Sequence, residues 1–285
     1  MGTMDGRTVV ITGGNAGIGK ETAVALARDG ARVILTSRDA ARGAAALGEI
    51  TERSASTSVE VMGLDLASLT SVRTFAEQVL AATDRIDVLV NNAGLLLQQR
   101  TETEDGFETT FGVNHLGHFL LTALLRDRLV ASAPARVVVV ASNAHTFARS
   151  GLDFDDLQST RRYSAFPVYA RSKLANILFT NELARRLDGT GVTANSLHPG
   201  YVDSRFGRDG DSGGLDWFFG LGARLFAIPP EEGAATSVFA SRDPGIATVT
   251  GAYFVKSQVR RASARATDVA AAARLWELSE RLVTA

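Results

Sequence analysis

The feature that most constrains the fold is a repeated alternation of short β-branched runs with longer amphipathic stretches. The runs occupy residues 8–12, 32–36, 59–64, 86–90, 136–141 and 192–197. Four consecutive valines at residues 137–140 leave no polar face, which indicates a strand buried on both sides, as in a parallel sheet covered by helices. Repeated strand–helix–strand units predict a single-domain, doubly wound α/β fold of the Rossmann type, with a parallel sheet of about seven strands and helices on both faces.

Length and composition agree with this fold and exclude several other classes of protein. The 285 residues suit one large domain, and 45% of them are hydrophobic, a normal globular value. A net charge of −1 gives no electrostatic reason to expect nucleic acid or an anionic membrane as a partner. The absence of cysteine excludes disulfides, thiolate metal sites and a cysteine nucleophile, and it fits a reducing compartment.

No segment of the sequence has the features of a targeting or membrane-spanning element. Residues 1–6 contain no apolar stretch, so they do not resemble a signal peptide. The apolar run at residues 119–125 ends at Arg126 and Asp127, far short of the ~20 residues that a membrane helix needs. We therefore expect a soluble, cytoplasmic protein without a membrane partner.

The second half of the chain adds two long helices around a segment of different composition. Residues 163–187 are predicted to form one helix, broken only near Pro167, and residues 231–240 a further helix. A last helix over about residues 265–283 begins near Thr267 and Asp268. Between them, glycine is frequent and the apolar side chains are large, as at Trp217 and Phe218.

A glycine-rich turn, from Thr12 to Gly19, joins the first predicted strand to the first predicted helix. Side chains are excluded where the backbone must come close to a pyrophosphate, and the helix N-terminus offers free N–H groups to the anion. The spacing Gly-x-x-x-Gly-x-Gly between a strand and a helix favours a dinucleotide site over an ordinary glycine-rich turn. The candidate contacts are Gly13, Asn15, Gly17, Ile18 and Gly19.

The end of the second predicted strand indicates which nucleotide the site prefers. An acidic residue there would bind a ribose 2′-OH and repel a 2′-phosphate, but this chain has Ser37 and Arg38. A guanidinium can bind the phosphate through charge-assisted hydrogen bonds, each contributing about 1.5–3 kcal/mol. Asp39 is interpreted as the cap of the next helix, and a merely solvated Arg38 is the alternative. The pattern favours NADP(H) over NAD(H).

Tyr169 and Lys173 are four positions apart, so a helix places them on one face. Such a pair occurs by chance in many helices, but here it accompanies several other motifs in a fixed order. They are the glycine turn, the Asn-Asn-Ala-Gly segment from Asn91 to Gly94, Ser142, and Tyr169 with Lys173. In these motifs the chain resembles the short-chain dehydrogenase/reductases over about residues 8–200.

Three longer segments resemble one branch of that family, the retinol dehydrogenases and WW-domain oxidoreductases. They are residues 111–120, 169–176 and 196–200. The resemblance implies NADP(H) as cofactor and an apolar small-molecule carbonyl or alcohol as substrate. Many animal members of the branch have an N-terminal membrane anchor. Because the first strand begins almost at once here, we expect no anchor, which argues against a retinoid held in the membrane as the substrate.

Hydride transfer to a carbonyl builds negative charge on oxygen, which requires a proton donor and a hydrogen-bond donor. The resemblance gives Tyr169 as the acid, and Ser142 as the group that holds the substrate oxygen. It also gives Asn114 as part of a water-linked proton path to Lys173. An ammonium ~4 Å away, at an effective dielectric constant of ~20, would stabilise the Tyr169 phenolate by ~4 kcal/mol. We therefore expect Lys173, with help from an oxidised nicotinamide, to lower the tyrosine pKa of about 10 by about three units.

The resemblance implies further contacts with the cofactor. Lys173 would also hold the nicotinamide ribose, and Asp65 and Leu66 would contact the adenine, with a helix cap as the alternative role for Asp65. The remaining candidates line the cofactor or meet its nicotinamide amide and pyrophosphate: Asn91, Ala93, Gly94, Pro199, Gly200, Val202 and Ser204. Residues 5–200 would then form the cofactor and catalytic core.

Residues 201–228 are expected to form a substrate lid, because this is where the family varies. The large apolar side chains of the segment favour an apolar, bulky ligand. Packing in the core, or in a subunit contact of a homodimer or homotetramer, is the alternative.

His115 and His118 have helical spacing, but no acidic or cysteine partner accompanies them, so we expect packing and no metal. His145 and His198 are interpreted as structural. The leading functional hypothesis is an NADP(H)-dependent carbonyl reductase or alcohol dehydrogenase. A catalytically silent nucleotide-binding regulatory or scaffold protein is the alternative, and an epimerase or dehydratase on the same fold is a third hypothesis.

Overall fold

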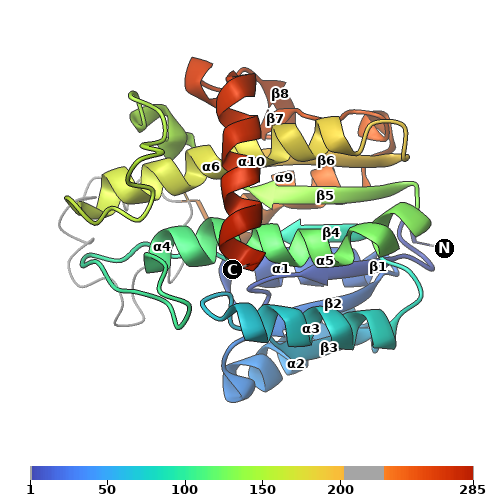
Figure 1. Cartoon of the computed structure of the whole chain (residues 1–285). Helices are drawn as coiled ribbons and strands as arrows, with labels where there is room; N and C mark the ends of the chain where they lie inside the picture. Colours follow the sequence, from blue (N-terminus) through green and yellow to red (C-terminus); the bar gives the residue numbers. More distant parts are fainter. Residues whose placement is uncertain (1, 202–227, 285) are drawn as a thin grey trace.

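The computed structural model describes residues 2–201 and 228–284, and within them eight strands form one sheet. The strands are β1 (Thr8–Ile11), β2 (Arg32–Ser37), β3 (Val59–Gly63), β4 (Val88–Asn91), β5 (Ala135–Val140), β6 (Val192–His198), β7 (Tyr253–Val255) and β8 (Gln258–Arg260). Their order is β3-β2-β1-β4-β5-β6-β7-β8 (Figure 1). The order reverses direction between β1 and β4, which makes this pair the switch point of a doubly wound sheet.

The predicted fold is confirmed, with one addition at the edge of the sheet. All neighbouring strands from β3 to β7 are parallel, and β8 pairs antiparallel to β7. The turn between these two strands uses Lys256 and Ser257, whose φ values of 52° and 56° lie in the left-handed region. Two successive residues with positive φ are typical of a tight hairpin turn, normally signalled by glycine or asparagine. The sequence lacks that signal here.

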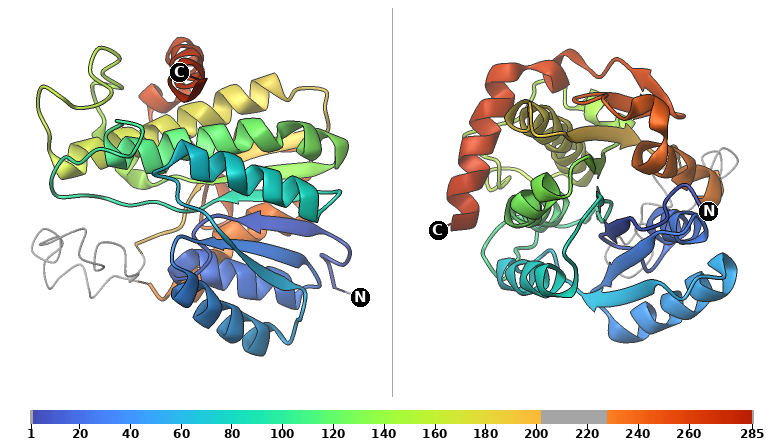
Figure 2. Two further views of the ribbon diagram at one scale, coloured as in Figure 1. Left: turned by 60° about the horizontal axis from the view of Figure 1, so that its bottom comes forward. Right: turned by 90° about the vertical axis from the view of Figure 1, so that its right-hand side faces the viewer.

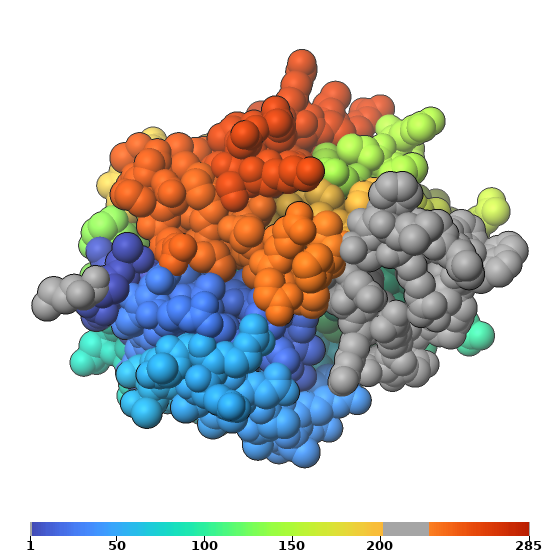
Figure 3. All heavy atoms as spheres, turned by 180° about the vertical axis from the view of Figure 1, so that it is seen from behind, coloured from blue at the N-terminus to red at the C-terminus, as the bar shows by residue number. Residues whose placement is uncertain are grey.

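Helices cover both faces of the sheet (Figures 1 and 2). One layer consists of α3 (Leu69–Ala82), α5 (Gly117–Ala131) and α6 (Ala165–Arg186), with α10 (Val269–Thr284) outermost across α6. The other layer consists of α1 (Gly17–Arg28), α2 (Ala40–Ser54) and α9 (Pro230–Arg242), and forms the surface seen from behind in Figure 3. None of these helices, nor any other in the described residues, combines the length and apolar content needed to cross a membrane.

The valine run of β5 is buried from both sides, as the sequence predicts. Val137 and Val139 belong to the apolar core beneath α3, α5 and α6, whereas Val138 and Val140 belong to the core beneath α1 and α9. All four side chains are buried. A strand placed between two helical layers has no face on which a polar side chain could reach water.

Two helix boundaries differ from the sequence prediction. Pro167 does not break α6, because the helix begins at Ala165 and the proline lies in its first turn. A proline is tolerated there, since the backbone N–H groups of a first turn have no partner within the helix. At the other end of the chain, residues 264–267 form a 3₁₀ turn, and Asp268 caps α10 by accepting a hydrogen bond from the Ala271 amide at 2.9 Å.

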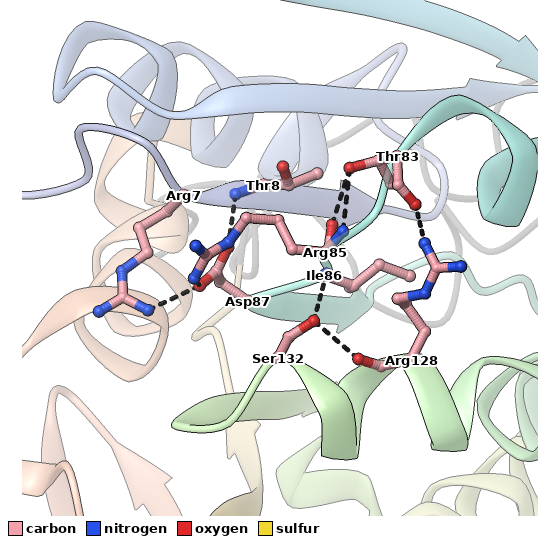
Figure 4. A network of polar contacts seen from close by, with 8 residues as sticks. All are labelled: Arg7, Thr8, Thr83, Arg85, Ile86, Asp87, Arg128 and Ser132. Atoms are coloured by element: carbon pink, nitrogen blue, oxygen red, sulfur yellow. Dashed lines mark hydrogen bonds and ion pairs between the residues drawn. The ribbon is translucent and has the colours of Figure 1, made fainter.

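A buried ionic network fastens the amino ends of β1 and β4 (Figure 4). The Asp87 carboxylate is 2% exposed and accepts hydrogen bonds from the Thr8 amide at 2.8 Å and from the guanidinium groups of Arg7 and Arg85. Burial by itself would raise the pKa of Asp87, but these hydrogen bonds outweigh burial and hold the pKa below its usual value. The network lies at the end of the sheet opposite the glycine-rich turn.

Candidate active site

The glycine-rich turn connects β1 to α1 and is packed closely against the loop that follows β4. Gly13 has a φ of +64°, and a Cβ built on it would lie 3.0 Å from the Ala93 Cβ atom. A Cβ on Gly19 would lie 2.4 Å from the Gly13 carbonyl oxygen, so a side chain there would push the helix away from the turn. Ala16, the N-cap of α1, makes no side-chain hydrogen bond to the first turn of the helix. The turn therefore offers backbone N–H groups that fit a phosphate.

Thr12 and Asn92 hold this arrangement together. The Thr12 hydroxyl oxygen accepts hydrogen bonds from the backbone amides of Asn92 at 2.9 Å and Ala93 at 3.0 Å. In return, the Asn92 side-chain amide donates to the carbonyl oxygens of Thr12 at 2.8 Å and Gly13 at 3.2 Å. Asn92 is not among the contacts predicted from the sequence, although it belongs to the Asn-Asn-Ala-Gly motif.

The end of β2 lies beside the glycine-rich turn. The Gly13 and Gly14 amides donate to the Thr36 side chain and backbone at 3.1 and 3.2 Å. Asp39 caps α2, as predicted, by accepting a hydrogen bond from the Arg42 amide at 2.8 Å. Arg38 is exposed between these residues, at the edge where the turn offers its N–H groups.

The hydrogen bonds of the segment after β3 show whether Asp65 caps α3, which was the alternative to an adenine contact. Ser68, and not Asp65, is the N-cap of α3. The Asp65 carboxylate accepts a hydrogen bond from the Ala67 amide at 2.9 Å in a local turn and stays partly exposed. Leu66 is buried against α5, where a Cβ on Gly117 would lie 2.7 Å from the Leu66 carbonyl oxygen. The helix-cap alternative for Asp65 is therefore wrong.

Ser142 and Tyr169 come from different elements and meet at the carboxyl end of β5. Ser142 follows that strand and begins a 3₁₀ turn over residues 143–147, while Tyr169 lies in the second turn of α6. Burial raises the pKa of Tyr169 to about 12, and a hydrogen bond with the Ser142 hydroxyl acts in the opposite direction. Without a bound cofactor, the prediction that Lys173 lowers the pKa of Tyr169 is wrong, because desolvation of the phenol is the largest effect on that pKa.

Lys173 lies one turn further along α6 and is 3% exposed. Its ammonium donates a hydrogen bond to the Val140 carbonyl oxygen at 2.9 Å and lies 5.6 Å from the centre of the Tyr169 ring. Burial lowers the pKa of Lys173 to about 8. A Cβ built on Gly94 would lie 3.3 Å from the ammonium nitrogen, so only glycine leaves the space in front of this group open.

Asn114 lies in a single π-helical turn, over residues 112–116, between α4 (Thr109–Phe111) and α5. Its side chain is fully buried: Oδ1 accepts from the Leu95 amide at 2.8 Å, and Nδ2 donates to the Leu95 carbonyl at 2.9 Å and to the Ser172 hydroxyl at 3.0 Å. The Ser172 hydroxyl donates in turn to the Tyr169 carbonyl oxygen at 2.8 Å. Ser172 thus connects Asn114 to the helix of Tyr169, a contact that no motif in the sequence indicates.

The two histidines at the junction of the π-helical turn and α5 are engaged in packing, His115 in the turn and His118 in the first turn of the helix. The His118 imidazole bridges the Thr12 hydroxyl at 2.9 Å and the Asn114 carbonyl at 3.2 Å, and His115 lies 2.8 Å from the Ser279 hydroxyl of α10. Burial lowers the pKa of both imidazoles, to about 4 and about 3 respectively. Within residues 2–201 and 228–284, no group of three or more histidine or carboxylate side chains is placed to hold a metal ion.

A family model described as short chain dehydrogenase matches residues 7–153 and 156–212. The chain belongs to the short-chain dehydrogenase family. It is therefore a NAD(P)-dependent oxidoreductase.

Individual relatives agree with this assignment. Human retinol dehydrogenase 14 is 45% identical over 296 residues, covering 99% of this chain and 88% of the relative. Among solved structures, an uncharacterised protein of Mycobacterium paratuberculosis is 38% identical with a TM-score of 0.78, covering 98% of this chain and 94% of the other. A short chain dehydrogenase from Burkholderia cenocepacia J2315, in complex with NADP, is 26% identical with a TM-score of 0.69, covering 88% and 96%. This dehydrogenase is thus retinol dehydrogenase-like.

The rest of the predicted cofactor contacts lie along the same edge of the dehydrogenase. Asn91 is buried and donates to the Thr122 hydroxyl of α5 at 2.9 Å, so its amide nitrogen ties β4 to that helix. Pro199 and Gly200 follow β6, and Gly200 has a φ of +103°. Val202, Ser204 and nearly all of the predicted lid at residues 201–228 lie outside the described residues.

Proposed function

We propose that this dehydrogenase transfers hydride between NADP(H) and the carbonyl or alcohol group of an apolar small molecule. The observation that carries the proposal is the meeting of Ser142, Tyr169 and Lys173 beside the carboxyl edge of β1, β4 and β5. The glycine-rich turn lies on that same edge. In an open α/β sheet, ligands bind outside the carboxyl ends of the strands at the switch point.

The chain itself would perform the proton half of the reaction. When bound, the nicotinamide supplies or accepts the hydride at the substrate carbon. In reduction, the Tyr169 hydroxyl gives its proton to the carbonyl oxygen as the alcohol forms, and the Ser142 hydroxyl donates a hydrogen bond to that oxygen. The nearby Lys173 ammonium then stabilises the phenolate that remains on Tyr169. Alcohol oxidation reverses each of these transfers.

The residues present fit a dinucleotide. Side chains at Gly13 or Gly94 would fill the space along the edge, and the uncapped first turn of α1 suits a pyrophosphate. Arg38 supports NADP(H) as the preferred form, because its cationic side chain is exposed next to the turn and no acidic residue occupies its position. The NADP named for the Burkholderia protein agrees with this choice for a related fold.

An apolar substrate is supported by the residues around the catalytic edge and by the names of the relatives. Phe147 is 58% exposed at the end of the turn that begins at Ser142, and its ring lies edge-on to Phe166, 5.2 Å away, in the first turn of α6. The relatives' name makes retinol and retinal the first pair of substrates to try. The sequence between residues 202 and 227, which lies outside the described residues, is rich in large apolar side chains such as Trp217, and this composition also favours an apolar ligand.

The test measures NADPH and NADH oxidation with three probes: retinal, decanal and a polar keto acid. We expect turnover of the two apolar aldehydes with NADPH, slower turnover with NADH, and none with the keto acid. Retinol oxidation with NADP⁺ is measured as the reverse reaction. If the protein binds NADPH but neither reduces a carbonyl probe nor oxidises retinol, the catalytically silent regulatory protein is favoured. Preference for the keto acid would reject the apolar substrate while leaving the chemistry in place.

A further inference from the structure

His145 is a buried imidazole with both ring nitrogens engaged, three residues after Ser142. Its side chain is 1% exposed. Nδ1 lies 2.7 Å from the Ser142 carbonyl oxygen, and Nε2 lies 3.1 Å from the backbone nitrogen of Ser263. The two contacts connect the 3₁₀ turn of the candidate catalytic serine to a C-terminal segment 118 positions away.

These contacts fix the tautomer of His145. A backbone N–H can only donate, so Nε2 must accept from Ser263 with its lone pair. The ring proton then resides on Nδ1, which donates it to the Ser142 carbonyl oxygen. Burial lowers the pKa of His145, while the bond to Ser142 acts in the opposite direction. The imidazole is therefore neutral, and each nitrogen has one defined role.

The turn is held by a second residue of the C-terminal region. Tyr253 of β7 is 5% exposed, and its ring lies edge-on to His145 with the centres 5.1 Å apart. Its hydroxyl donates to the Asn143 side-chain oxygen at 2.8 Å. Within the turn, the Ala144 amide donates to the Ser142 hydroxyl oxygen at 3.1 Å. Both the backbone and the side chain of Ser142 are thus held by bonds that depend on the shape of this turn.

We propose that His145 is a positioning residue that sets the orientation of the Ser142 hydroxyl through its Nδ1 bond to the Ser142 carbonyl. The inference rests on the proposed function, since a serine needs this orientation only if it holds a substrate oxygen. His145 touches neither substrate nor cofactor in this role. The Ser142 carbonyl oxygen can only accept, so this bond by itself keeps the proton on Nδ1, and the Ser263 amide adds a second hold on the ring.

Three substitutions of His145 separate its two bonds. His145→Phe keeps a ring and removes both bonds. His145→Asn places an amide nitrogen where Nδ1 lies, and His145→Gln places an amide oxygen near Nε2. Ser263→Pro is the matched control for the Nε2 bond, because it removes that N–H at a residue whose φ of −62° suits proline, and the hydroxyl that is lost with it has no hydrogen-bond partner among the described residues.

The measurements are kcat and KM with NADPH and decanal, the Kd of NADPH, and the Tm of each variant. We expect kcat of His145→Phe and His145→Gln to fall about 10- to 100-fold, since a small misplacement of a reacting group has effects of this size. His145→Asn and Ser263→Pro should stay within about threefold of the wild type, because the bond to Ser142 is kept. The Kd of NADPH should not change in any variant.

If His145 only stabilises the fold, the variants should show a different pattern of kcat and Tm. His145→Gln would then be the active variant and His145→Asn the impaired one, or all variants would lose Tm without losing kcat, and either result overturns the inference. If His145→Phe does not fold, the comparison of the asparagine and glutamine variants decides. Should the wild type bind NADPH yet turn over no probe, the proposed function fails and the positioning role with it. An active wild type with an equally active His145→Phe rejects the positioning role alone.

Discussion

The Lys173 ammonium nitrogen lies 5.6 Å from the centre of the Tyr169 ring, one helical turn further along α6. Burial shifts both groups towards their neutral forms, raising the pKa of Tyr169 to about 12 and lowering the pKa of Lys173 to about 8. Tyr169 therefore keeps its proton throughout the neutral range, as its proposed role as the acid in carbonyl reduction requires. The reverse reaction needs the phenolate, whose formation depends on the positive charge nearby.

Replacement of Tyr169 by phenylalanine tests the proton donor. The Tyr169→Phe variant keeps the ring beside Lys173 but has no proton to give, so kcat for carbonyl reduction should fall by about 10²–10⁴. The Kd of NADPH, followed by fluorescence, should remain close to the wild-type value. A variant that reduces decanal at the parent rate would falsify the role assigned to the hydroxyl.

Replacement of Lys173 by methionine should change stability and activity in opposite directions. An unfolded lysine has a pKa of about 10.4, and the lower folded value means that burial of the charge destabilises the fold at every pH below about 8. The penalty decreases as pH rises through that value and vanishes above the unfolded pKa. At pH 7, Lys173→Met should therefore raise the free energy of unfolding by about 1–3 kcal/mol, while kcat falls.

Chemical unfolding at pH 7 and pH 10 checks this expectation. The advantage of the methionine variant should shrink at the higher pH, where the wild-type lysine is mostly neutral. A variant less stable than the wild type at pH 7 would mean that the hydrogen bond to Val140 contributes more than the burial of the charge costs. Lys20→Met, which removes a lysine paired with Glu49 on the surface, serves as the control.

The sequence could predict most of the fold because strand burial and helix capping are local signals. The valine run of β5 and the cap at Asp39 needed no knowledge of distant contacts, and both agree with the structure. The hairpin of β7 and β8 escaped prediction because Lys256 and Ser257 adopt positive φ without the usual turn residues. Favourable pairing with the edge of the sheet overrides their local preference.

The residues of the candidate site could be predicted from the sequence, but the hydrogen bonds that join them to their neighbours could not. Ser142, Tyr169 and Lys173 followed from motifs, and the sheet topology brings them to one edge. The contacts of Ser172 with Asn114 and of Ser263 with His145 depend on side-chain packing across long separations in sequence. The pKa of Tyr169 could not be obtained from charge spacing, because desolvation exceeds the effect of a single ammonium once the phenol is buried.

Substitution of Arg38 tests how the cofactor is selected. In Arg38→Asp, an acidic side chain replaces the cation at the end of β2, which should favour a ribose 2′-OH and repel a 2′-phosphate. We expect the ratio of kcat/KM for NADPH to that for NADH to fall by about 10- to 100-fold. Lys20→Ala should leave the ratio unchanged, since that lysine is paired with Glu49. An unaltered ratio in Arg38→Asp would assign phosphate recognition to another cation, such as Arg42.

Asp87→Asn should destabilise the dehydrogenase without affecting its chemistry. Hydrogen bonds hold the folded pKa of Asp87 below its ordinary value, so its stabilising contribution is complete above the unfolded pKa and is lost as pH falls through the folded pKa. The free energy of unfolding should fall by about 1–2 kcal/mol at pH 7, because the buried carboxylate loses its charge-assisted hydrogen bonds while both guanidinium groups stay partly exposed to water. This difference from the wild type should shrink below about pH 4.

Because the network lies at the far end of the sheet, kcat and KM should not change. Glu60→Gln, at a partly exposed pair with Arg32, is the matched control and should alter stability by no more than about 1 kcal/mol. A difference between Asp87→Asn and wild type that stays constant down to pH 2 would contradict the assignment of an ionised, paired Asp87.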